Sequence, residues 1–333
     1  MAVSTIDPNG LNVGQFGNRN LIINGDFSIS QRSTSVTGAT SSGYATVDRW
    51  WHNASGGTQN MSQQSLAVGQ TDLPSQFTKF FRFASTSGNN HQGFAQKIEN
   101  VELLSGTTVT VSFYAKGTNP GAGSVKLAYL QYFGSGGSAQ VEAEAYSITL
   151  TSSWQLFKAT ISLPSVSGKT IGAGNSTYVY FRQGASDTST AAWTMDVTGV
   201  QVEVSPTGEA TPFEHISFGD QLQKCQRYYE TDNPATPTSF GGNLAARSYH
   251  IANGSGNPMS RDGMTLPYKV TKRASPTVTS YSYNGTSGAV SYITGGGTDT
   301  NVQIRSSAES FQLSSSTYRA LNVWFAWAAD AEL

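Results

Sequence analysis

The feature that most limits the fold of this chain is a series of short segments with the residue pattern of β-strands, separated by Gly- and Ser-rich turns. In the clearest of them, 109–116, alternation places Val109, Val111, Phe113 and Ala115 on one face. Further segments of this kind lie at 21–23, 48–51, 79–83, 125–133, 145–150, 154–163, 178–182 and 193–204. Strands this short and this numerous predict an all-β, two-sheet sandwich or jelly roll over residues 20–215.

Charged residues are scarce. They make up 12% of the chain, against about a quarter of an ordinary globular protein. The net charge is -1 and no window holds a cluster of Lys and Arg, so we expect no nucleic-acid partner. No run of 18 apolar residues occurs, so we expect no membrane insertion.

Cys225 is the single cysteine, which excludes an intrachain disulfide and a Cys-based zinc site. The first residues lack the basic and apolar regions of a secretory signal. The chain is built like an extracellular adhesin but has neither a disulfide nor a secretory signal. We therefore expect it to be a particle component that is assembled in a cytoplasm and released by lysis.

The sequence predicts three further regions around the sandwich. Residues 1–19 are rich in Gly and Asn, and they are either a frayed terminus or an arm that docks into a larger particle. Residues 216–234 combine a short helix with a linker, and Phe218, Leu222, Cys225 and Tyr229 share one face of that helix. We expect this stripe to pack between domains or around an oligomer axis.

Residues 235–333 predict a second, C-terminal β domain. Strand candidates lie at 268–272, 277–283, 289–293, 302–305, 311–313 and 321–328, and Asn284-Gly285 has the composition of a hairpin turn. The last candidate is strongly apolar, so we expect it to be a buried central strand.

Specific strings of the sequence then suggest a family. Residues 20–27 read NLIINGDF, and QRSTS at 31–35, Tyr44 and Asp48-Arg49-Trp50 follow them. Further strings are VQVEV at 200–204, ATPFEH at 210–215, CQRYYE at 225–230 and the ending ADAEL. Together they resemble two signatures of bacteriophage tail-fibre and virion structural proteins, with Ser33 standing where a Gly is usual.

This resemblance covers residues 20–51, 200–230 and the C-terminal end. It implies a jelly roll related to carbohydrate-binding modules, followed by a C-terminal β domain, in a homotrimer that is anchored to the virion through the N-terminal arm. It also implies a tail-fibre or receptor-binding subunit that attaches to host-surface glycans.

Candidate glycan-binding residues come from aromatic side chains on strands. Alternation sends Trp50 and Trp51 to opposite faces, so one would join the core and Trp51 could stack on a sugar. On the strand at 125–133 one face carries Tyr129, Gln131 and Phe133, and Tyr146 or Tyr180 are possible neighbours. A sandwich core would accept the same residues, so both alternatives stay open.

A structural calcium site is the one cofactor that the resemblance suggests, with Asn24, Asp26 and Asp196 as its ligands. Ser28 stands where related modules often carry an acidic residue. The alternative is that Asp26 caps a turn and Asp196 pairs with an arginine.

Catalysis has little support in the sequence. None of the four histidines lies at helical spacing from another, and HExxH, GxSxG and Walker patterns are missing. Glu142 and Glu144 are close in sequence, but a solvated strand face explains them. The sequence therefore favours a non-enzymatic adhesin. A purely structural role as a capsid decoration, head fibre or baseplate component is the alternative, and a polysaccharide depolymerase is a weaker one.

Overall fold

The computed structural model describes residues 18–121, 123–205, 208–232, 247–250, 264–282, 285–292, 299–314 and 322–333. The chain forms two compact units. Unit one comprises residues 1–28, 35–217 and Leu333, and unit two comprises Ile29–Thr34 and Phe218–Glu332. The sequence placed 29–34 inside the sandwich, but these residues cluster with unit two.

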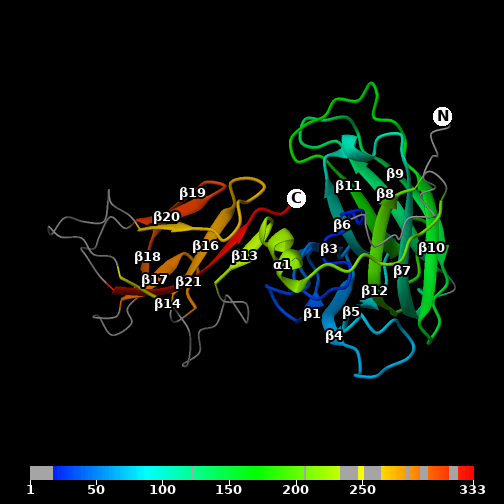
Figure 1. The fold of residues 1–333 in the computed structure, drawn as a ribbon, viewed down its shortest axis with the longest axis horizontal. Coiled ribbons are helices and arrows are strands. Elements are labelled where there is room, and N and C mark those ends of the chain that lie inside the picture. The colour runs from blue at the N-terminus through cyan, green and yellow to red at the C-terminus, as the bar shows by residue number, and fades with distance from the viewer. Residues whose placement is uncertain are drawn as a thin grey trace, which may run out of the picture. The chain divides into compact units, whose positions relative to one another are not determined.

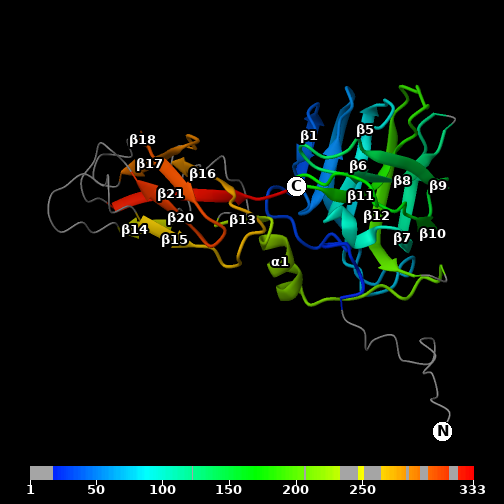
Figure 2. The same cartoon turned by 90° about the horizontal axis from the view of Figure 1, so that it is seen from above.

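Unit one is a sandwich of two six-stranded antiparallel sheets (Figures 1 and 2). Sheet A contains, in spatial order, β1 (Ser35–Ala39), β4 (Thr58–Ser65), β5 (Lys79–Ser87), β12 (Trp193–Val204), β7 (Thr108–Thr118) and β10 (Gln155–Ser162). Sheet B contains β2 (Gly43–Tyr44), β3 (Trp50–Asn53), β6 (Gly93–Glu99), β11 (Ser176–Gln183), β8 (Val125–Tyr132) and β9 (Val141–Ile148). A 3₁₀ turn at Val101–Leu104 follows β6.

The strand order identifies this sandwich as a jelly roll. From β5 to β12 the chain crosses from one sheet to the other with each successive strand, except between β8 and β9. The resulting orders are β5-β12-β7-β10 and β6-β11-β8-β9, which are two interlocked Greek keys. The predicted all-β sandwich is therefore confirmed, with β1–β4 extending the two sheets.

Aromatic side chains fill the space between the two sheets. Trp50, Phe94 and Phe181 enter from sheet B, while Phe81 and Phe113 enter from sheet A. Each of these five side chains is at most 2% exposed. The predicted inward face of 109–116 is confirmed, because all four of its residues belong to this core. By contrast, 21–23 forms no strand.

In its described residues, unit two forms one helix, a six-stranded sheet and a three-stranded sheet. Its elements are α1 (Phe218–Gln226), β13 (Tyr229–Thr231), β14 (Arg247–His250), β15 (Met264–Pro267), β16 (Thr277–Ser282), β17 (Ala289–Tyr292), β18 (Asp299–Asn301), β19 (Gln303–Ser306), β20 (Ser310–Ser314) and β21 (Asn322–Asp330). Strand β21 pairs with β13, β14, β16 and β17, so the predicted central position of the last strand is confirmed.

The segment Ile29–Thr34 is tied to β13 and β21 by side-chain contacts. The Gln31 amide donates to the main-chain oxygen of Tyr229 at 2.8 Å. The Arg32 guanidinium lies 3.7 Å from the centre of the Tyr229 ring, and it also pairs with Asp330 at 3.0 Å. An early segment of the sequence thus forms part of unit two.

Helix α1 is shorter than predicted. It ends at Gln226, so Tyr229 lies on β13 and not on the helix. Because Tyr229 lies outside the helix, the prediction that all four residues share one helical face is wrong. Cys225 is buried, Phe218 is 63% exposed, and packing of this region in an oligomer stays a prediction. The nine residues of α1 are too few to span a membrane, and no other described helix could do so. Residues 268–272, predicted as a strand, follow β15 as an irregular segment, and Asn284 lies outside the described residues.

Acid is expected to destabilise unit one through His52. Its ring is 4% exposed, and Nδ1 lies 2.8 Å from Oε1 of Gln59. Burial lowers the pKa of His52 below its ordinary value of 6.5. The unfolded chain takes up a proton near that value and the folded chain only at lower pH. The stabilisation is therefore complete above pH 6.5 and is lost as the pH falls through the folded pKa.

Urea unfolding at pH 7.5 and at pH 5.0 measures this dependence. We expect the midpoint to fall less with acid in His52→Asn, which retains a donor for Gln59 but cannot titrate. Equal falls in the two proteins would show that His52 does not contribute.

Candidate functional site

Four aromatic side chains project from the outer face of sheet B: Trp51 on β3, Tyr132 on β8, and Tyr178 and Tyr180 on β11. We call them the outer aromatic face. They arise from strand alternation, because their neighbours Trp50, Val179 and Phe181 point into the core. The register pairs Trp51 with Ala95, Ala95 with Tyr180, and Tyr180 with Ala128. The small alanines leave room for the rings.

The four rings form one connected cluster with edge-on contacts. Trp51 lies 6.0 Å from Tyr178 and 6.2 Å from Tyr180, and Tyr132 lies 6.5 Å from Tyr178. Tyr180 is 4% exposed, Trp51 and Tyr178 are half-buried, and Tyr132 is 36% exposed. The cluster thus offers apolar ring surface along one side while its base is packed on Ala95 and Ala128.

Lys97 on β6 holds part of this cluster in place. Its ammonium lies 5.1 Å from the centres of the Trp51 and Tyr178 rings and 5.6 Å from that of Tyr44. It also donates to the main-chain oxygen of Leu333 at 2.5 Å. A cation surrounded by three rings restrains their positions.

Beside the rings, charged groups gather around Arg182 on β11. Its side chain is almost fully buried, and its guanidinium lies 3.7 Å from Glu142 and 3.5 Å from Glu144, both on β9. It also contacts Nδ1 of His91. The two acidic residues that were close in sequence therefore converge on one arginine. Across the register, Arg182 faces Lys126 of β8.

Two phenol groups of the cluster, those of Tyr178 and Tyr180, stay protonated at neutral pH. Burial, followed by the nearby Tyr132, raises the pKa of Tyr178 to about 12. Burial also raises the pKa of Tyr180, whose hydroxyl accepts from Asn53 at 2.8 Å and donates to the main-chain oxygen of His91. A face of this kind can pack the C–H side of a sugar ring on aromatic surface and bind hydroxyls through charged side chains.

Of the predicted glycan-binding residues, Trp51 lies on the outer aromatic face. The second set, Tyr129 and Gln131 on β8 and Phe133 just after it, points the other way. Gln131 is 1% exposed and donates to the main-chain oxygen of Pro164 at 2.9 Å. Phe133 is 1% exposed and packs with Val101. Tyr129 packs against the main core. Their prediction as an exposed platform is therefore wrong, because this side of β8 faces the opposite sheet.

Tyr146 on edge strand β9 is 39% exposed. It pairs with Leu127, whose side chain enters the core, so Tyr146 does not join the outer aromatic face. Tyr178 and Lys97 were not predicted as site residues, and Tyr132 was assigned no role. A usable signal was present: Val125 and Leu127 alternate in phase with Tyr129, and two aliphatic residues mark the inner side of a strand.

Each of the predicted calcium ligands has another hydrogen-bond partner in the chain. Both carboxylate oxygens of Asp196 bind the Arg82 guanidinium, at 2.7 and 2.8 Å. Asp26 accepts from the hydroxyl of Ser28 at 3.0 Å, and the Asn24 amide donates to the main-chain oxygen of Asp48. The alternative arrangement, with Asp26 in a turn and Asp196 paired with an arginine, is the one observed. Within the described ranges, no group of three His, Cys, Asp or Glu side chains could hold a metal ion.

No protein-family model matches the chain, and no curated protein matches it either. Solved structures give matches of low similarity. The CBM22-2 xylan-binding domain of Xyn10C from Paenibacillus barcinonensis is 18% identical, with a TM-score of 0.33, and the match covers 47% of this chain and 92% of that one.

Two further matches have similarly low sequence identities and TM-scores. The N-terminal cellulose-binding domain of β-1,4-glucanase C from Cellulomonas fimi is 21% identical over 39% of this chain and 80% of that one, with a TM-score of 0.28. The enzymatically active domain of tailspike protein 4 from bacteriophage CBA120 is 13% identical over 56% of this chain and 22% of that one, with a TM-score of 0.30. With values this low, the assignment of a jelly roll rests on the strand order of this chain.

Proposed function

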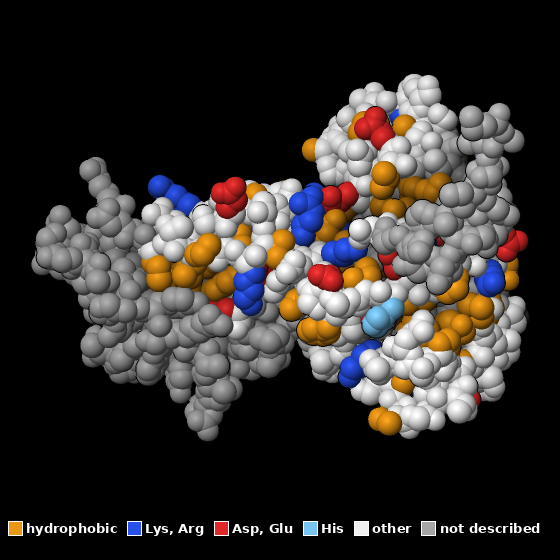
Figure 3. Space-filling model, viewed as in Figure 1, with side chains coloured by type: hydrophobic (Ala, Val, Ile, Leu, Met, Phe, Trp, Pro, Cys, Tyr) orange, Lys and Arg blue, Asp and Glu red, His pale blue; other side chains and the backbone are white. Residues whose placement is uncertain are grey.

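We propose that the protein is a non-enzymatic glycan-binding protein, and that the outer aromatic face of sheet B is its binding surface. The observation that carries this proposal is the connected row of Trp51, Tyr178 and Tyr132 rings. Tyr180 joins this row to Arg182, whose guanidinium lies 5.4 Å from the Tyr180 ring, and Arg182 faces Lys126. Apolar ring surface next to charged hydrogen-bonding groups is the chemistry that a saccharide needs, since a sugar has one C–H side and many hydroxyls. Charged residues make up only 12% of the chain, and few of them are visible on the face drawn in Figure 3, which favours a neutral ligand over a polyanion.

The virion role is the second part of the proposal, and it is supported by the sequence strings at 20–51 and 200–230. In this proposal the protein is a tail-fibre or receptor-binding subunit on a phage particle, assembled as a trimer in the host cytoplasm and anchored through residues 1–19. Three copies would multiply weak sugar contacts on a host surface. Among the described residues, Phe218 at 63% and Val204 at 54% are large apolar side chains exposed enough to meet another chain.

Removing the indole of Trp51 is expected to weaken glycan binding at least tenfold, or about 1.4 kcal/mol. The measurement is binding of the full chain to an array of bacterial, plant and mammalian oligosaccharides, followed by titration of the best binder with Trp51→Ala. Trp154→Ala is the matched control, because Trp154 is a half-buried tryptophan of unit one with a lysine, Lys116, at 5.1 Å. The control is expected to bind as the parent does.

Three results would change the proposal. An array without signal above background would favour the purely structural virion role. Equal losses of glycan affinity in Trp51→Ala and Trp154→Ala would show that the binding surface lies elsewhere. Release of reducing ends from a bound polysaccharide would indicate a depolymerase.

A further inference from the structure

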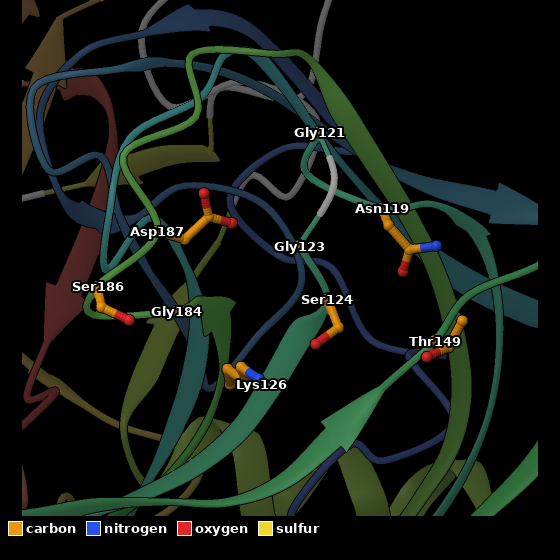
Figure 4. Close-up of a pocket in the computed structure, with 9 residues that line it drawn as sticks. All are labelled: Asn119, Gly121, Gly123, Ser124, Lys126, Thr149, Gly184, Ser186 and Asp187. Atoms are coloured by element: carbon orange, nitrogen blue, oxygen red, sulfur yellow. The ribbon is translucent and has the colours of Figure 1, made fainter.

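A polar pocket lies at the end of sheet B, where β8 begins and β11 ends. Its volume is about 680 Å³, within the range of small-molecule sites. The lining comes from four parts of unit one: the segment between β7 and β8, the start of β8, the residue that follows β9, and the loop after β11. Figure 4 shows Ser186 and Asp187 on one side of the pocket in that view, and Asn119 and Thr149 on the other.

The pocket adjoins the charged end of the outer aromatic face. Lys126 lines the pocket, and it also faces Arg182 across the register of sheet B. Gly184 lines the pocket too, and the next residue, Ala185, donates its main-chain N–H to Glu144 at 2.6 Å. A glycan that is bound along the outer face of sheet B and extends past Arg182 therefore reaches this pocket.

The lining selects for hydroxyl groups. The nine described residues that line it are Gly, Ser, Thr, Asn, Lys and Asp, so none of these nine offers an aromatic or aliphatic wall. The Lys126 ammonium donates to the Ser147 hydroxyl at 2.8 Å, which leaves two of its three N–H groups for a ligand. Lys126 and Asp187 contribute opposite charges, so the pocket favours a neutral ligand over a charged one.

Asp187 has hydrogen-bonding capacity that the chain does not use. Its Oδ1 accepts from the main-chain N–H of Ser189 at 2.9 Å, while its Oδ2 is buried and has no hydrogen-bond partner within the described residues. A Cβ at Gly123 would lie 2.3 Å from that oxygen, so only glycine there lets the two loops approach so closely. Oδ2 is thus closed off by the Gly123 loop, whereas the half-buried carboxylate keeps a second lone pair on Oδ1, and this oxygen can accept from a ligand hydroxyl.

We propose that this pocket is a second subsite, which binds one neutral, hydroxyl-rich sugar unit at the end of the glycan. The proposal rests on the proposed function, because the outer aromatic face would hold the units that precede the end. Asp187 accepts from one sugar hydroxyl and Lys126 donates to another.

The test is NMR titration of the isotope-labelled full chain with glucose, galactose, mannose, N-acetylglucosamine and glucuronate, each at millimolar concentration. We expect at least one neutral sugar to shift the main-chain amide signals of Gly121, Gly123 and Gly184, and glucuronate to shift them less. Asp187→Asn and Lys126→Met are each expected to weaken that binding at least tenfold. The matched controls, Asp72→Asn and Lys158→Met, replace exposed residues of unit one away from the pocket and are expected to bind like the parent.

The possible failures are distinguishable. If no monosaccharide shifts the pocket signals while longer oligosaccharides still bind in a Trp51-dependent way, the subsite is wrong and the proposed function stands. If single sugars bind at the pocket but Trp51→Ala leaves oligosaccharide binding unchanged, the aromatic face is wrong and the pocket stands. A stronger response to glucuronate than to every neutral sugar would overturn the neutral-ligand assignment.

Discussion

Replacing Phe94 by alanine is expected to lower the free energy of unfolding of unit one by about 3–5 kcal/mol. Phe94 is 0% exposed, and its ring lies 5.2 Å from Phe181 of its own sheet and 5.2 and 5.4 Å from Phe81 and Phe83 of the opposite sheet. The side chain thus joins the two layers of the jelly roll. Its loss removes the buried ring and leaves a cavity that neighbouring aromatic rings cannot easily fill.

Urea unfolding followed by tryptophan fluorescence measures the effect, since Trp50 and Trp193 lie in the same core. Leu156→Ala on β10 is the matched control. That side chain is 48% exposed, so the change is expected to stay within about 0.5 kcal/mol. A cost below about 1 kcal/mol for Phe94→Ala would mean that the two sheets do not meet at this ring.

Strand patterning was sufficient to predict the sandwich, because burial between two sheets imposes a period of two on each strand. It also separated Trp50 from Trp51 correctly: Trp50 is 2% exposed in the core and Trp51 lies on the outer face. On β8 the same rule divided the side chains into the right two sets. The choice of the exposed set was wrong, because it followed the sugar-binding chemistry of Tyr, Gln and Phe and not the aliphatic Val125 and Leu127, which mark the inner side.

The site itself depends on long-range pairing that no local pattern contains. Trp51, Lys97, Tyr132 and Tyr178 come together only because β3, β6, β11 and β8 are successive neighbours in sheet B. The end of α1 was misjudged for a similar reason. Tyr229 continues the helical spacing of Leu222 and Cys225, but pairing of β13 with β21 draws it into a sheet. Tertiary contacts override a pattern of this length.

In unit two, replacing Lys272 by methionine is expected to cost about 3–5 kcal/mol. The side chains of Lys272 and Glu230 are 0% and 1% exposed, and Nζ lies 2.6 Å from Oε2 of Glu230. Glu230 also accepts from the main-chain N–H of Lys269, at 3.1 Å. Removing the ammonium leaves a carboxylate without its counter-charge in a site closed to water, and that is the source of the cost.

The double variant Lys272→Met/Glu230→Gln separates loss of the pair from loss of packing. A neutral amide keeps an acceptor for Lys269 and needs no counter-charge, so the double variant is expected to be more stable than Lys272→Met alone. Hydrogen exchange of peptides covering β13 and β16 measures the effect in unit two, and Lys269→Met is the control because that side chain is exposed. If the single and double variants lose equal protection, the methionine fits poorly and burial of the lone carboxylate is not the cause. If neither loses any, Glu230 reaches water in solution, and the pair does not stabilise the fold.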